Sequence, residues 1–296
     1  MRDLVLPDTP SNLGLRPPSR DIEPGCAKLA RALRGCDLLE RLNALDDGIV
    51  APPRYAPVWT KSGGPPNAQA LAAYSRLLAD RIAPLFDESV LPVVLGGDCS
   101  ILLAPMLALK RRGRHCIAYF DAQTDFWRLG KSQSLEAVGG EDVAIMTGRG
   151  DARFADMELR GPSVSIADVA YIGVRDDASY LEETLALGAR AFTALKIERN
   201  GANGIAKRLL DGFSDVPGFW IHLDLDVVDG GILPAVDSLE PAGLDYATVS
   251  ALLEAVSRSP KALAVTVAIF DPDLDPDGRN ARAVSDCIVT AFSEEM

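Results

Sequence analysis

The stretch that decides the fold is CIAYFDAQTDFW, from Cys116 to Trp127, in which five apolar residues stop abruptly at two aspartates. A short run of β-branched and aromatic residues bounded by turn formers is typical of a strand in a parallel sheet that is covered on both faces. Such sheets bind ligands in the crevice beyond the carboxyl ends of their strands, which is where Asp121 and Asp125 fall. We therefore expect a buried strand that ends in a polar site.

Two other apolar runs end in the same way. LPVVL at 91–95 leads into GGDCS at 96–100, and FWIHL at 219–223 leads into Asp224 and Asp226. Because parallel strands end at the same edge of their sheet, the three runs bring carboxylates and one cysteine together there. Chance turn chemistry explains one aspartate after a strand more readily than three such clusters.

Apolar periodicity places the other elements. We expect further strands at 4–6, 169–174 and 263–270, and helices at 27–45, 68–85, 101–111, 180–187, 204–212, 246–257 and 281–292. This alternation predicts an α/β fold, in which helices cover both faces of a parallel sheet. The proline-rich loops at 7–24 and 51–66 are expected near the rim of the site. No repeat or linker divides the chain, so residues 1–296 are expected to form a single domain.

The charge balance limits the possible partners. A formal charge of −12, from 30 basic and 42 acidic residues, disfavours nucleic acid and anionic membranes, which both require a basic surface. No apolar stretch approaches the roughly eighteen residues that span a bilayer, and no signal-peptide pattern opens the chain. The five cysteines are scattered and include no CxxC, which fits a reducing compartment. We expect a cytoplasmic protein that acts on a small molecule.

The clustered aspartates suggest a metal. Asp121, Asp125, Asp224 and Asp226 would place four carboxylates in one pocket, which is costly unless cations compensate their charge. Oxygen ligands suit Mn²⁺ or Mg²⁺, whereas a thiolate from Cys99 favours a softer ion such as Zn²⁺ or Fe²⁺. The alternative is that these aspartates cap the helices that follow the strands. The residues alone leave both interpretations open.

Three ordered motifs resemble those of a known family. GGDCS at 96–100, DAQTDF at 121–126 and HLDLDVVD at 222–229 look like the signature motifs of the arginase/agmatinase/formiminoglutamase (ureohydrolase) family. The likeness extends to PSNLGLRPP at 10–18, YIGVRD at 171–176, LPAVDSLEPAGL at 233–244 and IFDPDLDPDG at 269–278. It implies a three-layer α/β/α fold, a manganese pair at the carboxyl edge of the sheet, and hydrolysis of a guanidino group to urea and an amine. It also implies a homo-oligomer, either a trimer or a hexamer.

The resemblance assigns metal ligands position by position. One ion would bind Cys99, Asp121, Asp125 and Asp224, and the other would bind Asp121, Gln123, Asp224 and Asp226. Cys99 stands where the family more often has histidine, and a thiolate is a competent ligand. Gln123 also replaces a histidine, and its neutral amide oxygen binds a divalent ion more weakly than imidazole does. The resemblance thus implies one or two Mn²⁺ ions, with the Gln123 site the weaker.

The resemblance also assigns catalytic residues. Asp125 would relay a proton to the leaving amine, and Glu136, in the loop after the second motif, could act as a general acid or base or be a solvated loop residue. Gly139 is the residue nearest to the position of a proton-shuttling histidine. His222, beside Asp224, is expected to be a packed, hydrogen-bonded residue in preference to a catalytic one.

Substrate contacts depart from the family pattern too. Trp127 occupies the position at which the family has an asparagine that contacts the substrate. Its ring either stacks on a substrate cation or forms a wall of the pocket. Glu240, in the rim loop, either contacts the substrate or is a plain surface residue. Ile269 stands where the family has a glutamate that holds the guanidinium. Free arginine is therefore a poor candidate substrate.

Two hypotheses follow, with a third between them. The first is a metal-dependent hydrolase of a linear amidine or guanidino compound, in which the metal activates water. The second is a catalytically silent arginase-fold protein that serves as a binding or oligomeric scaffold, because Gln123, Gly139 and Ile269 each remove a group that the reaction uses. The third is a mononuclear enzyme of altered specificity.

Overall fold

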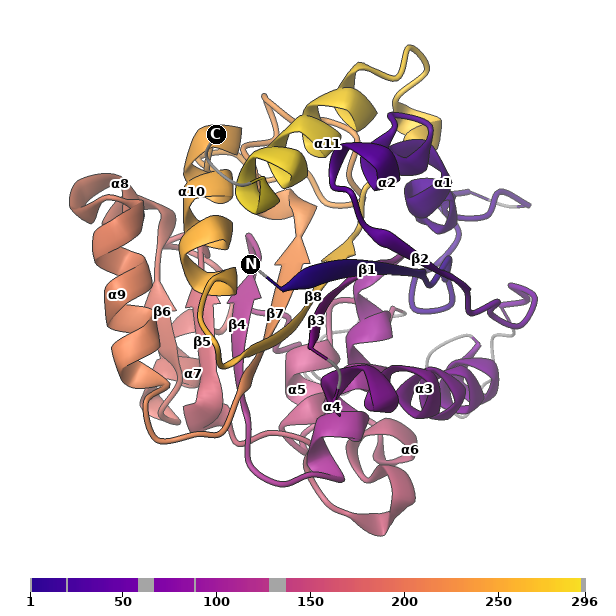
Figure 1. Ribbon diagram of the computed structural model, residues 1–296. Coiled ribbons are helices and arrows are strands. Elements are labelled where there is room, and N and C mark those ends of the chain that lie inside the picture. The colour runs from indigo at the N-terminus through magenta and orange to yellow at the C-terminus, as the bar shows by residue number, and fades with distance from the viewer. Residues whose placement is uncertain (1, 20, 58–66, 88, 128–136, 294–296) are drawn as a thin grey trace.

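A parallel sheet of eight strands crosses the centre of the molecule (Figure 1). The computed structural model describes residues 2–19, 21–57, 67–87, 89–127 and 137–293. The strand order is β2-β1-β3-β8-β7-β4-β5-β6. In chain order the strands are β1 (Asp3–Asp8), β2 (Leu45–Ile49), β3 (Val90–Leu95), β4 (Cys116–Phe120), β5 (Val169–Ile172), β6 (Arg190–Phe192), β7 (Phe219–Asp224) and β8 (Ala262–Ala268).

Helices cover both faces of this sheet, and each layer closes its own apolar cluster (Figure 1). One layer contains α1 (Leu29–Arg34), α2 (Leu38–Arg41), α8 (Ala194–Asn200), α9 (Ala202–Gly212), α10 (Tyr246–Ser257) and α11 (Arg279–Phe292). The other contains α3 (Ala68–Ile82), α4 (Leu103–Lys110), α5 (Asp142–Met146), α6 (Ala152–Ala155) and α7 (Leu181–Ala186). The predicted three-layer α/β/α fold is confirmed. None of the helices in the described ranges is long and apolar enough to cross a membrane.

Short 3₁₀ turns link several of these elements. They are η1 (Gly25–Lys28), η2 (Ala83–Asp87), η3 (Cys99–Leu102), η4 (Met157–Leu159), η5 (Ile166–Asp168), η6 (Leu225–Val227) and η7 (Pro272–Leu274). The turn η6 directly follows the third motif strand, and η3 begins after the three residues 96–98 that follow the first. Tight turns at these points keep the motif side chains at the edge of the sheet.

The helix predicted over 27–45 is wrong in its extent. The segment forms η1, α1 and α2, and Asp37 between the two α-helices has a left-handed φ of 59°. From Leu45 the chain forms β2, an edge strand of sequence LDDGI whose residues are mostly exposed. Its charged sequence suits a protected sheet edge. Because apolar and polar residues do not alternate in it, the hydrophobic periodicity gave no sign of a strand.

Strand register brings the motifs to one height. Phe120 of β4 pairs with Leu223 of β7, so Asp121 and Asp224 follow at equivalent positions of neighbouring strands. Strand β8 lies between β7 and β3, and Ala268 pairs with Asp224. The three motifs and Ile269 therefore gather at the carboxyl ends of four adjacent strands, as ligand sites do in parallel sheets.

The first proline-rich loop packs onto the GGDCS motif. A Cβ on Gly97 would lie 1.7 Å from the Ser11 carbonyl oxygen, so only glycine permits this approach. Asp98 accepts a hydrogen bond from the Gly14 amide at 3.1 Å, which makes its carboxylate a brace for the loop. From the second loop, the Tyr55 hydroxyl donates to the Leu15 carbonyl at 3.1 Å. Both loops thus approach the site, as expected.

Candidate active site

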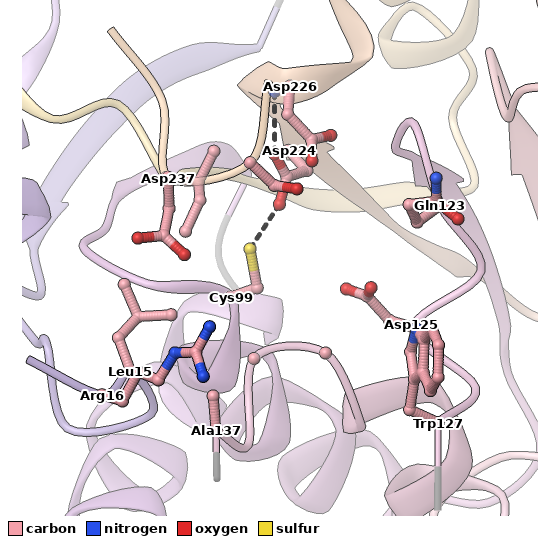
Figure 2. A pocket seen from close by; sticks show the side chains of 14 residues that line it. Leu15, Arg16, Cys99, Gln123, Asp125, Trp127, Ala137, Asp224, Asp226 and Asp237 are labelled. Carbon is pink, nitrogen blue, oxygen red and sulfur yellow. Dashed lines mark hydrogen bonds between the residues drawn. The ribbon is translucent and has the colours of Figure 1, made fainter. Parts of the chain in front are cut away.

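A pocket of about 320 Å³ opens at the carboxyl ends of these strands. Figure 2 shows Cys99, Asp224, Gln123 and Asp125 around it, so all three motifs contribute to one cavity. Its other described lining residues are Leu15, Arg16, Trp127, Ala137, Gly139, Gly140, Asp226, Asp237, Ser238 and Ile269. The volume lies near the lower end of the range for small-molecule sites, ~300–1,000 Å³.

Asp224 caps the short turn η6, while Asp121 and Asp226 accept hydrogen bonds from backbone amides of loop residues. Asp224 accepts from the Asp226 amide at 2.8 Å, Asp226 accepts from the Ala122 amide at 3.0 Å, and Asp121 accepts from the Gln123 amide at 2.6 Å. Each of these contacts uses one carboxylate oxygen. The second oxygen of Asp121, Oδ2, is buried and has no hydrogen-bond partner among the residues that the structure describes. Capping therefore accounts for only part of this cluster.

The carboxylates form a strongly acidic, buried cluster. Burial, reinforced by neighbouring carboxylates, raises the pKa of Asp121 and of Asp224 well above the usual range. Burial likewise raises the pKa of Asp125 to about 7 and that of Asp226 to about 6. Ligand oxygens of Asp121, Asp224 and Asp226 lie within 4.8 Å of one another. Because oxygen clusters of this kind suit a divalent cation, the residues present fit a metal.

Cys99 adjoins this cluster at the start of η3. Its thiol is buried and donates a hydrogen bond to Oδ2 of Asp224, as Figure 2 shows. Burial, and then the charge of Asp224, raises the pKa of this thiol well above its usual range. The metal-free protein therefore holds Cys99 as a protonated thiol, and binding an ion through sulfur requires loss of that proton.

Gln123 makes two hydrogen bonds within the protein. Its Nε2 donates to the Glu240 carboxylate at 3.1 Å, and its Oε1 accepts from the Ser179 amide at 3.2 Å. A backbone N–H only donates and a carboxylate only accepts, so these partners fix which amide atom is oxygen. That oxygen, the ligand atom that the resemblance implies, is engaged by Ser179. Glu240 contacts Gln123 and is not among the described residues that line the pocket.

Comparison with known proteins identifies the family. The profile of the Arginase family matches residues 16–293.

The chain belongs to the arginase family.

An arginase of Agrobacterium fabrum is 25% identical over 286 residues, which cover 93% of this chain and 87% of that protein. A formimidoylglutamase of Aeromonas salmonicida is 29% identical over 72% of this chain and 66% of its own length. The crystal structure of arginase from Bacillus subtilis superposes with a TM-score of 0.85 at 22% identity, covering 100% of both chains. Enzymes of the arginase family are hydrolases of small molecules and typically depend on two metal ions.

Asp125 of this arginase-family chain is held by a buried tyrosine. The Tyr119 hydroxyl lies 2.7 Å from Oδ2 of Asp125 and 2.9 Å from Oδ1 of Asp142. One phenolic proton cannot serve two carboxylates, and burial raises the pKa of Asp142 well above the usual range. The Tyr119 hydroxyl therefore links these two buried carboxyl groups. The sequence reasoning missed Asp142, although an acidic residue directly before the apolar run VAIM was a signal.

The walls of the pocket differ from the family pattern. Ile269 has a left-handed φ of 72°, a strained conformation for a β-branched residue, and its amide donates to the Gly97 carbonyl at 2.7 Å. An apolar side chain thus lines the pocket where the resemblance implies glutamate. The Trp127 ring lines another wall and packs edge-on against Tyr180 at 5.1 Å. Glu136 lies outside the described residues.

Arg175, from the YIGVRD motif, braces the loops behind the pocket. Its buried guanidinium donates to the carbonyl oxygens of Asp226 at 3.1 Å, Glu240 at 3.2 Å and Pro241 at 2.9 Å. The loop of the third motif and the rim loop that carries Glu240 are therefore held in one position relative to each other.

His222 is a packed, hydrogen-bonded residue, as expected. It is fully buried on β7, and its Nδ1 lies 2.7 Å from the Thr266 hydroxyl of β8. Burial lowers the pKa of the imidazole to about 3, so the ring is neutral. Its other nitrogen, Nε2, has no hydrogen-bond partner within the described part of the chain.

Proposed function

We propose that this protein is a metal-dependent hydrolase of a C–N bond in a linear amidine or guanidino compound, with a substrate other than free arginine. The observation that supports this most is the close approach of ligand oxygens from Asp121, Asp224 and Asp226, within 4.8 Å, beside a pocket in an arginase-family chain. A divalent ion bound there supplies Lewis acidity and lowers the pKa of water. Mn²⁺ is the proposed ion for this oxygen-rich group.

The protein's own residues would manage the protons. Asp125 lines the pocket beside the ligand group, and a carboxyl in that position can exchange a proton with the reacting groups. The Tyr119 hydroxyl fixes one of its oxygens, which leaves the other to face the reacting groups. We assign Asp125 the transfer of a proton to the leaving amine. Glu136 remains a second proposed acid or base.

The lining of the pocket suggests a substrate with an acidic group. Arg16 is the one cation among the described residues that line it, and in Figure 2 its guanidinium points into the cavity from the side opposite Trp127. A planar guanidinium pairs well with a carboxylate. Trp127 would face the amidine group of the substrate. Glu240 would act on the substrate indirectly, through its hydrogen bond with Gln123. Ile269 leaves the amidine without the carboxylate that the family pattern places there.

The test is a screen for ammonia and urea release after loading with Mn²⁺. Amidine and guanidino compounds are assayed in pairs that differ only in a terminal carboxylate. We expect turnover of a carboxylate-bearing member, and loss of at least about 100-fold in kcat/KM in Asp121→Asn. Arg16→Met should raise KM for that compound with little change in kcat, whereas Arg258→Met, on the surface of the protein, should change neither. Fewer than about half an ion per chain after loading would sink the proposal.

One observation favours the silent-scaffold alternative. Both polar atoms of the Gln123 amide are engaged by protein groups, so that residue supplies no free donor to a second ion. The Gln123→His variant separates the two functions. Metal content rising to two ions, together with hydrolysis that the native protein lacks, would support the scaffold, while activity of the native protein would end it.

A further inference from the structure

A buried histidine faces the metal ligands from the neighbouring part of the sheet. His222 precedes Asp224 by two positions on β7, so both side chains project from the same face of the strand. In the adjacent strand β4, Tyr119 is its register partner, and the two rings stack with centroids 5.0 Å apart and planes 25° apart. This contact holds the imidazole in one orientation, with Nε2 unpaired among the described residues.

The partners of Thr266 favour one tautomer of the imidazole. Its hydroxyl oxygen lies 3.3 Å from Nε1 of Trp220, which only donates, and 3.5 Å from the Ile221 carbonyl, which only accepts. We infer the tautomer in which the hydroxyl proton goes to that carbonyl, so that Thr266 accepts hydrogen bonds from Trp220 and from Nδ1 of His222 at 2.7 Å. Nε2 is then left with a bare lone pair. Metal-binding histidines have this arrangement, in which the other nitrogen donates to a protein oxygen.

We propose that Nε2 of His222, Sγ of Cys99 and a carboxylate oxygen of Asp224 bind one borderline-soft divalent ion such as Zn²⁺. A ring nitrogen of His222, the Cys99 sulfur and an Asp224 carboxylate oxygen lie within 4.8 Å of one another, and all three residues are buried. Because Nδ1 is engaged by Thr266, we assign the ligand role to Nε2. The thiol proton, now shared with Asp224, passes to solvent as the sulfur binds. A donor set of sulfur, nitrogen and oxygen favours Zn²⁺ or Fe²⁺ over Mn²⁺.

The inference rests on the proposed function, because its ligand group shares Asp224 with the oxygen-rich group to which Mn²⁺ is assigned and lies beside it. It adds that the imidazole absent from position 99 is replaced by one from β7. His222 was expected to be a packed, hydrogen-bonded residue in preference to a catalytic one, and its contacts with Tyr119 and Thr266 hold the imidazole in place.

The test uses the full chain loaded with Zn²⁺ and X-ray absorption at the zinc edge. The chain has two histidines, so an imidazole signal belongs either to His222 or to His115. We expect one Zn–S distance near ~2.3 Å and one imidazole nitrogen near ~2.0–2.1 Å. Both signals should persist in the matched control His115→Gln. His222→Asn keeps a donor for Thr266 and removes Nε2, so it should lose the imidazole signal and at least about 10-fold in Zn²⁺ affinity.

Three results would overturn the inference: no zinc uptake, zinc bound through sulfur without imidazole in the native chain, or an imidazole signal that disappears in His115→Gln. The native-chain spectrum decides the matter even if His222→Asn fails to fold. Zinc bound without imidazole, accompanied by amidine hydrolysis, would leave the proposed function standing. Imidazole ligation without hydrolysis of any amidine would support the inference and remove the function.

Discussion

The two sides of the metal cleft differ in whether their uncharged ligand atoms are already hydrogen-bonded to the protein. We call Cys99 and His222 the Cys99 side, and Gln123, Asp226 and Glu240 the Gln123 side; Asp224 is shared by the two. On the Cys99 side an imidazole nitrogen is left bare in the described structure, beside a thiol that can lose its proton. On the Gln123 side the amide oxygen and nitrogen both bind protein groups. Residue type alone therefore does not decide which side holds an ion, since the partners of each atom matter equally.

The largest effect is expected where the two sides meet. Asp224 contributes to both candidate ligand groups, so Asp224→Asn should abolish binding on either side and lower kcat/KM by more than about 100-fold. The metal-free variant should unfold at no lower temperature than the native apoprotein, because a buried acid has been removed. Metal analysis and calorimetry check this, with Asp215→Asn, an exposed partner of Arg114, as the control.

A smaller loss is expected from the Cys99 side alone. Cys99→Ser should weaken Zn²⁺ binding by about 10–100-fold, while Mn²⁺ binding changes less because oxygen replaces sulfur. Competitive titration with the two ions measures the ratio. Equal losses for both ions would show that the two sides do not differ in softness.

A substitution on the Gln123 side should strengthen metal binding there. Gln123→His exchanges an occupied amide for an imidazole and should tighten binding of a second ion by about 10-fold. Gln69→His, which adds an imidazole to the exposed face of α3, is the matched control and should add no bound ion. If neither variant changes metal content, the difference between the two sides lies elsewhere than in Gln123.

The smallest effect concerns pH. The pKa of Asp125 is about 7 and that of Asp226 about 6 in the folded apoprotein, both raised chiefly by burial. Because both lie above the value near ~4 in an unfolded chain, the folded state binds more protons between these limits, and its stability falls as pH rises through them. We expect the unfolding temperature of the apoprotein to drop by roughly 5 °C between pH 5 and pH 8.

Metal-loaded protein should lack this decline, since the ion replaces the protons. Differential scanning calorimetry of the two forms in parallel provides the comparison. An apoprotein that becomes more stable over the same range would contradict the raised pKa values.

Sequence reasoning succeeded where strand ends determine position. Asp121, Asp224 and Cys99 follow apolar runs, and parallel strands end at one edge, so their meeting followed from the chain alone. It failed for β6 and α5, which span three and five residues and are too short to show a period. Arg16 and the bare nitrogen of His222 were also missed as parts of the site. Their surroundings depend on loops and cross-strand partners that no local pattern contains.

The spacing of His222 and Asp224 on one strand has a consequence for redesign. Alternate residues of a strand share a face, so a metal-binding group can move from one strand to its neighbour through point substitutions, with no insertion or deletion. Positions 99, 222 and 266 then form a small set of choices that changes ion preference while the backbone stays fixed. A library restricted to these three positions would sample hard and soft metal centres on a single unchanged scaffold.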